Sequence, residues 1–183
     1  RYPHLPTYVV GFSLGGVLAT KLADSAPETE HPKALILFAP ALSLCTLPAI
    51  ASALHLPPAV SWRTPNLAPR AYRRYPTTPA FWYSNTLELH RELQTISNAS
   101  VMQNTPTLVF LNPRDELVSK NGIESWIDSN GLRQSWHEVV VNPTPEASDV
   151  AEHLIIDEHS LGASEWTRVK AEISAFLRNV QTR

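Results

Sequence analysis

Three short runs of almost continuous apolar residues constrain the fold of this 183-residue chain more than any other feature. They span residues 7–12, 34–38 and 107–111. Strands that are apolar on both faces need helices on both faces, which is the arrangement of parallel sheets in α/β proteins. A fourth run, residues 135–141, alternates more and contains polar residues, so it is predicted to be a strand nearer the sheet edge. The chain is therefore predicted to be an α/β protein with a mostly parallel sheet and flanking helices.

A helical pattern follows the first predicted strand. Leu14, Val17, Leu18 and Leu22 recur at helical spacing, and Pro27 prevents this helix from continuing. Strand, helix and strand then occupy about 30 residues, which is the size of a βαβ unit.

Two further helices are predicted towards the C-terminus. One lies near residues 121–130, where Asn121 and Glu124 have a capping arrangement and Gly131 supplies a left-handed stop. The other carries the apolar stripe of residues 166–180, which predicts a long terminal helix facing the core.

Residues 40–104 interrupt the alternation of strands and helices. This stretch is rich in proline and aromatic residues and has no strand candidate, which predicts an insertion between two sheet strands. Only residues 81–96 within it have a clear helical pattern. The expected organisation is therefore a core of residues 1–39 and 105–183 with an insertion of residues 40–104.

Charge and composition exclude several classes of function. The formal net charge of −2 gives no concentrated basic face, so nucleic acid is not an expected partner. Arg63, Arg70, Arg73 and Arg74 lie close together, but aromatic residues and prolines interleave with them, which favours a solvated surface over an anion site. The most apolar tract, residues 39–60, is interrupted by prolines and cannot span a bilayer.

The single cysteine, Cys45, can form neither an intrachain disulfide nor a cysteine-rich metal site. It fits a reducing compartment such as the cytoplasm without requiring one. Residue 1 is an arginine and the only methionine is Met102, so the sequence is expected to continue upstream of Arg1.

The sharpest motif is G-x-S-x-G at residues 11–15, followed by Gly16. It stands between a predicted buried strand and a predicted helix, a context in which the serine is held exposed on a sharp strand-to-helix turn. Gly11 and Gly15 are expected to remove side chains that would collide there, and Gly16 to let the helix approach the sheet. Ser13 is therefore the predicted nucleophile.

A serine nucleophile needs a base within hydrogen-bond reach and an acid that orients the base. Asp115 follows the strand of residues 107–111, at the end where catalytic groups of open α/β sheets gather, and is the predicted acid. Its neighbour Glu116 is expected to face solvent, and the alternative for Asp115 is a plain turn or capping residue. The backbone N–H of Leu14 is expected to point towards a developing oxyanion.

The base is expected after the last strand, which leaves His153 and His159, because His137 lies within that strand. The sequence favours His153, since it opens a loop that the apolar residues after it could anchor. His159 stays the alternative base.

These segments resemble the α/β-hydrolase superfamily, which includes serine esterases and lipases, from its nucleophile elbow onward. The resemblance is carried by Gly-Phe-Ser-Leu-Gly-Gly at 11–16, Asp-Glu-Leu-Val at 115–118 and His-Leu-Ile-Ile-Asp at 153–157. It implies that residues 40–104 are a helical cap domain and that no cofactor or metal is needed. It also implies a catalytic triad of Ser13, Asp115 and His153, with the N–H of Leu14 as one oxyanion donor.

Members of this superfamily have several strands before the elbow, and a loop there supplies the second oxyanion donor. Nothing in this sequence corresponds to them. The resemblance therefore implies that the strand of residues 7–12 lies at an exposed sheet edge, and we expect it to be completed either by an N-terminal half or by a partner chain.

The expected function is hydrolysis of a small-molecule carboxylic ester through an acyl-serine intermediate. Thioester or amide cleavage by the same residues is an alternative, because a fold does not decide the substrate. A further alternative is a non-catalytic or incomplete relative that acts through protein–protein binding. Metal-dependent hydrolysis is disfavoured, since His153 and His159 lack the i, i+4 spacing of a helical zinc pair.

Overall fold

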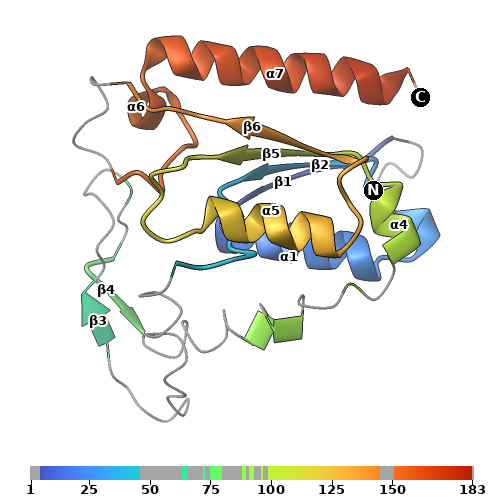
Figure 1. Ribbon diagram of the computed structural model, residues 1–183, viewed down its shortest axis with the longest axis horizontal. Coiled ribbons are helices and arrows are strands. Elements are labelled where there is room, and N and C mark those ends of the chain that lie inside the picture. The colour runs from blue at the N-terminus through green and yellow to red at the C-terminus, as the bar shows by residue number, and fades with distance from the viewer. Residues whose placement is uncertain are drawn as a thin grey trace.

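A four-stranded parallel sheet forms the centre of the molecule (Figure 1). The computed structural model describes residues 5–45, 63–65, 72, 75–79, 88–89, 91–92, 96, 99–144 and 151–182. The strand order is β1-β2-β5-β6, and the strands are β1 (Tyr8–Phe12), β2 (Ala34–Phe38), β5 (Thr107–Leu111) and β6 (Trp136–Val140). Each of the three strand pairs is parallel, which confirms the predicted α/β architecture.

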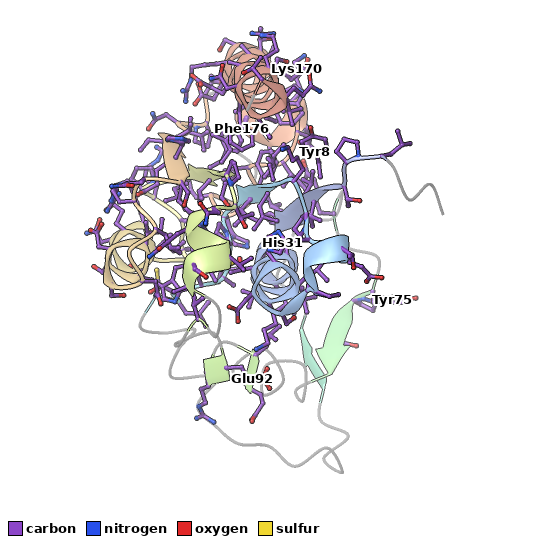
Figure 2. The ribbon with its side chains drawn as sticks, turned by 90° about the vertical axis from the view of Figure 1, so that its right-hand side faces the viewer. Tyr8, His31, Tyr75, Glu92, Lys170 and Phe176 are labelled. Carbon is purple, nitrogen blue, oxygen red and sulfur yellow. The ribbon has the colours of Figure 1, made fainter. Side chains whose placement is uncertain are left out.

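Helices cover both faces of this sheet (Figure 1). One face carries α1 (Leu14–Ser25), α4 (Ala99–Gln103) and α5 (Lys120–Ser129). The other face carries α6 (Glu158–Leu161) and the long α7 (Ala163–Gln181). Figure 2 views these layers from the side, with Phe176 of α7 turned towards the sheet and Lys170 turned away from it.

The sequence of β2 is apolar at every position because both of its faces are buried. Leu35 and Leu37 pack into the layer of α1 and α5, whereas Ile36 and Phe38 pack into the layer of α7. The ring of Phe38 also stacks on Phe110 of β5, with 4.8 Å between centroids. Each such large side chain stabilises the fold by about 1.5–3 kcal/mol when it is fully buried.

The two outer strands differ from the two inner ones. In β6, predicted to lie nearer the edge, only Trp136 is buried, and it is the last strand of the sheet. At the opposite end, β1 has a neighbour on one side only within the described part of the chain. Val10 of β1 is 64% exposed, and Leu18 and Leu22 of α1 are 53% and 49% exposed. The described chain therefore has an apolar edge at β1.

The helix ends agree with the sequence in most respects. α1 ends at Ser25, just before the predicted stop at Pro27, and Gly131 after α5 has a positive φ of 67°. The predicted cap at Asn121 is wrong, because Ser119 caps α5 with its hydroxyl, which accepts the N–H of Gly122 at 3.1 Å. Serine in this position satisfies an N–H that the helix itself cannot pair.

The segment predicted to be an insertion contains a small antiparallel pair, β3 (Arg63–Pro65) and β4 (Thr77–Pro79). The expectation that this segment has no strand is therefore wrong. Each member of a two-stranded pair is an edge strand, where proline is tolerated, so the prolines did not exclude strands here. The predicted helix 81–96 lies mostly outside the described residues, although residues 88–89 and 91–92 are helical.

Residues near both ends of the predicted insertion pack into the main core. Ala41 and Leu42 are 4% and 1% exposed, and Met102 of α4 is fully buried in the same cluster. The domain boundaries at 39/40 and 104/105 stay a prediction.

Candidate active site

The serine turn joins β1 to α1 at Ser13. Ser13 has φ 52° and ψ −118°, and Ala39, which follows the neighbouring strand β2, has φ 39°. Such conformations cost about 1–3 kcal/mol each in a residue other than glycine. Hydrogen bonds hold the turn, because the Ser13 N–H donates to Phe38 O at 2.9 Å and the Ser13 carbonyl accepts from Ala41 N–H at 3.0 Å.

Glycine is needed at two places around this turn. A Cβ on Gly11 would lie 2.5 Å from the backbone oxygen of Gly15, and a Cβ on Gly16 would lie 2.6 Å from Cβ of Pro40. The expectation for Gly15 itself is wrong, since nothing lies within 4 Å of a Cβ there. The close approach is therefore made by the backbone of α1 against β1 and against the loop after β2.

His153 lies between Ser13 and Asp115. Its Nε2 is 2.8 Å from Ser13 Oγ, and its Nδ1 is 2.8 Å from Asp115 Oδ2. The three side chains come from the ends of β1 and β5 and from the segment after β6. The structure thus brings together the three residues that the sequence singled out.

His159, the alternative base, lies elsewhere. It is exposed in α6 and its ring stacks on Tyr72, with 6.1 Å between centroids. His137 lies within β6, as expected, and is exposed there. Neither residue has a described contact with Ser13 or Asp115.

Asp115 is held by three hydrogen bonds. Its side chain is 2% exposed. Oδ1 accepts the N–H groups of Leu117 at 2.8 Å and Val118 at 2.9 Å, while Oδ2 faces His153. A buried carboxylate needs such partners to offset the cost of losing water. Asp115 is thus both a turn residue and the partner of His153, while Glu116 is exposed as expected.

A short backbone ladder fixes the loop that carries Asp115. Ser119 N–H donates to Ser43 O and Cys45 N–H donates to Leu117 O, both at 2.9 Å. Burial, followed by the charges of Asp115 and Glu116, raises the pKa of the Cys45 thiol. The thiol therefore stays protonated at neutral pH and is a poor nucleophile.

The segment after His153 is anchored as expected. Ile155 is fully buried and Leu154 nearly so. Asp157 then caps α6 by accepting the Ser160 N–H at 2.8 Å, while Ser160 Oγ accepts the Asp157 N–H.

Tyr72, from the predicted insertion, reaches this same segment. Its hydroxyl donates to Asp157, with Oδ1 at 2.8 Å and Oδ2 at 3.0 Å. Burial and the hydrogen bond to Asp157 raise the pKa of Tyr72 to about 12. Burial alone would raise the pKa of Asp157, but the bonds from Ser160 and Tyr72 lower it below its usual value. Tyr72 thus contacts the segment that holds His153.

Two side chains at this site, Phe12 and Asn112, escaped the sequence reasoning. Phe12, one residue before Ser13, packs its ring against His153 with 5.0 Å between centroids. Asn112, directly after β5, is hydrogen-bonded to Glu152, the residue before His153. For Phe12 the available signal was its place in the motif, and for Asn112 it was a polar residue directly after a buried strand.

No cluster of three or more His, Cys, Asp or Glu side chains that could hold a metal ion occurs in the part of the chain that the structure describes. Among those residues, too, no helix has the length and apolar character needed to cross a membrane. A groove does occur between β6 and α7, with Leu108, His137 and Arg168 among its lining residues, but Ser13, Asp115 and His153 do not line it.

The chain was compared with protein families, curated sequences and solved structures. No protein-family model matches the sequence, and no curated protein sequence matches it. The chain is similar in structure to a soluble variant of monoglyceride lipase from Saccharomyces cerevisiae, solved with a substrate analogue, at a TM-score of 0.68 and 15% identity. It is also similar to a metagenome-derived lipolytic enzyme, at a TM-score of 0.58 and 12% identity.

These alignments take in 97% and 95% of this chain but 63% and 66% of the two solved structures. The chain therefore spans less than two thirds of the length of the structures it resembles. Together with the parallel sheet and its flanking helices, this likeness shows that the chain has an α/β-hydrolase fold.

Proposed function

We propose that this protein is a serine hydrolase that cleaves carboxylic esters through an acyl-serine intermediate, with Ser13 as nucleophile, His153 as base and Asp115 as acid. The observation that carries the proposal is the unbroken chain of contacts from Ser13 Oγ through the His153 ring to Asp115, each 2.8 Å long. A serine hydroxyl is a weak nucleophile unless an adjacent base can take its proton.

The proposed mechanism assigns the protons as follows. A carboxylate only accepts hydrogen bonds, so Nδ1 of His153 carries the proton that faces Asp115. Nε2 is then left with a lone pair and accepts the hydroxyl proton of Ser13. Asp115 also stabilises the imidazolium that forms when this proton is transferred.

In the first half of the reaction, Ser13 Oγ forms a bond to the ester carbonyl carbon while its proton passes to Nε2 of His153. The carbonyl oxygen becomes an oxyanion. When the tetrahedral intermediate collapses, the ester C–O bond breaks and the imidazolium gives its proton to the departing alkoxide. An alcohol leaves and the acyl group stays on Ser13.

In the second half, water attacks the acyl-serine carbonyl and gives a proton to His153. The bond to Ser13 Oγ then breaks, the proton returns to this oxygen, and a carboxylic acid is released. Neither half-reaction of the proposed mechanism requires a cofactor.

We assign one oxyanion donor to the backbone N–H of Leu14. Leu14 is the first residue of α1, so its N–H has no acceptor within the helix. The positive end of the helix dipole lies at the same place. Loss of one such donor costs about 10²–10³ in kcat in serine hydrolases.

One observation supports esters as the substrate class: the solved structures that the chain resembles are a monoglyceride lipase and a lipolytic enzyme. We further propose that residues 40–104 act as a cap, because Tyr72 holds this segment to Asp157, four residues after His153. Thioester or amide cleavage would use the same three side chains.

A second proposal concerns the β1 edge, defined by the exposed side chains of Val10, Leu18 and Leu22. An apolar strand without a neighbour exposes unpaired backbone groups and invites pairing. We propose that a further strand, from the same polypeptide or a partner chain, pairs with β1 in the active protein. Hydrogen exchange tests this: the outward amides of β1 should exchange slowly in the active protein and fast in residues 1–183 alone.

Labelling with a fluorophosphonate probe, followed by mass spectrometry of the modified peptide, tests the main proposal. The probe should modify Ser13 in the active protein, and Ser13→Ala should abolish both labelling and hydrolysis of p-nitrophenyl butyrate while leaving the melting temperature nearly unchanged. Activity of Ser13→Ala within tenfold of wild type would refute Ser13 as nucleophile.

A further inference from the structure

We propose that Asn112 is a positioning residue for the reaction proposed above, on which this inference rests. Its carboxamide holds the backbone next to His153, so that the imidazole stays between Asp115 and Ser13. The inference starts from the burial of Asn112, which directly follows β5 and is 2% exposed.

Every hydrogen-bonding group of the Asn112 side chain has a partner. Nδ2 donates to the backbone oxygen of Glu152 at 2.8 Å and to the Glu152 carboxylate at 2.7 Å. Oδ1 accepts the N–H of Arg114 at 3.0 Å. A buried amide satisfied in this way is rigid, since moving it would leave polar groups unpaired.

These bonds join the two segments that meet in the site (Figure 1, left side). Asp115 is three residues after Asn112, and His153 directly follows Glu152. On its C-terminal side, His153 is followed by the buried residues Leu154 and Ile155, which anchor the chain there. The bond from Asn112 to Glu152 O adds an attachment on the N-terminal side, one residue before His153, so the backbone is held on both sides of the imidazole.

The chemistry of the partners explains why an amide suits this position. A backbone carbonyl and a carboxylate both accept hydrogen bonds, so only a group with two donor protons can serve both. The negative charge of Glu152 is also offset by Arg114, whose Nη2 lies 3.3 Å from it. A carboxylate at position 112 would instead face Glu152 with like charge and donate nothing.

A simpler role for Asn112 is to form the turn that begins the Asp115 loop. That role uses only Oδ1, which accepts the Arg114 N–H two residues on in the manner of an Asx turn. Aspartate supplies the same oxygen. The substitution Asn112→Asp therefore keeps the turn and removes the tie to the histidine segment, which separates the two roles.

Asn104→Asp is the matched control. Asn104 is exposed at the end of α4, and its Nδ2 also donates to a backbone carbonyl, that of Ser100 at 2.9 Å. The two substitutions make the same chemical change, and each removes a bond from a side-chain amide to a backbone carbonyl. Asn112→Asp also places a charge in a buried position beside the Glu152 carboxylate, an effect that the neutral Asn112→Ser variant lacks.

The experiment measures p-nitrophenyl butyrate hydrolysis by the full-length active protein and its variants. Asn112→Asp should lower kcat by about 10- to 100-fold with KM within about twofold of wild type, because a small misplacement of a catalytic group costs rate rather than binding. Asn104→Asp should leave both constants unchanged. In proton NMR, the downfield resonance of the His153 Nδ1 proton should exchange faster with water in Asn112→Asp alone.

Asn112→Ser gives a second test if Asn112→Asp does not fold, because a hydroxyl can form the same turn but cannot serve both acceptors. Wild-type kcat and an unchanged Nδ1 resonance in a folded Asn112 variant would overturn the inference. A failure of the proposed function looks different: wild type would neither hydrolyse esters nor label at Ser13. The exchange rate of the Nδ1 proton would still decide the role of Asn112 in that case.

Discussion

The ring of Phe12 packs against the imidazole of His153, with 5.0 Å between centroids and 38° between ring planes. Phe12, which directly precedes Ser13 in the chain, thus packs against the same histidine whose Nε2 lies 2.8 Å from Ser13 Oγ. The motif around Ser13 therefore contributes a packing surface for the base as well as the hydroxyl.

The first prediction concerns this packing. Phe12→Ala should lower kcat for p-nitrophenyl butyrate by about 2- to 10-fold, because aromatic pairs contribute about 0.5–1.5 kcal/mol beyond simple burial. Phe12→Leu, which keeps much of the apolar wall, should lose less. Equal losses in the two variants would mean that the ring contact has no specific effect on the base.

The second prediction separates the two candidate bases. His153→Ala should lower kcat by about 10⁴-fold or more, since its imidazole lies between Ser13 and Asp115. His159→Ala should change kcat by less than about tenfold, because its ring faces Tyr72. The reverse order of effects in steady-state kinetics would contradict the assignment of His153.

The third prediction contrasts two glycines of the serine turn. Gly11→Ala should destabilise the protein by about 1–3 kcal/mol or prevent folding, since its Cβ would lie 2.5 Å from Gly15 O. Gly15→Ala meets nothing within 4 Å and lies in α1, so it should be neutral or stabilise by up to about 1 kcal/mol. Urea unfolding of the two variants, followed by circular dichroism, measures both values.

The fourth prediction concerns acid stability. Hydrogen bonds from Arg168 lower the pKa of Glu165, and bonds from Ser160 and Tyr72 outweigh burial to lower that of Asp157. A folded-state pKa below the unfolded value contributes stability above the unfolded value, about 4, and this stability is lost as pH falls through the folded value. The free energy of unfolding should therefore fall as the pH is lowered below about 5.

Asp157→Asn tests this effect, because asparagine can still cap α6 but does not titrate. The variant should be less stable than wild type at pH 7 and should lose less stability between pH 5 and pH 3. Urea titrations at several pH values give the free energy of unfolding of each protein as a function of pH. If this free energy falls equally steeply with pH in wild type and variant, Asp157 does not contribute to the acid transition.

Much of the fold follows from the sequence. The runs 34–38 and 107–111 are buried at every position and almost wholly apolar because both faces of β2 and β5 are covered, and their bounds are those predicted. The proline-rich pair β3 and β4 was not predicted, since three-residue strands have too few positions for an alternating pattern. The cap of α5 was assigned to Asn121 rather than Ser119 because both residues are good caps and only the backbone conformation distinguishes them.

By itself, the sequence determined the parallel sheet and the place of Ser13 on the turn between a buried strand and a helix, because both depend on neighbours along the chain. It also narrowed the partners of Ser13 to Asp115 and two histidines. Only the tertiary structure decided that His153 and not His159 lies against Ser13, and that Asn112 ties Glu152 to the Asp115 loop. These contacts join residues 140 and 40 positions apart, and no local pattern encodes which side chains meet when the ends of separate strands are brought together.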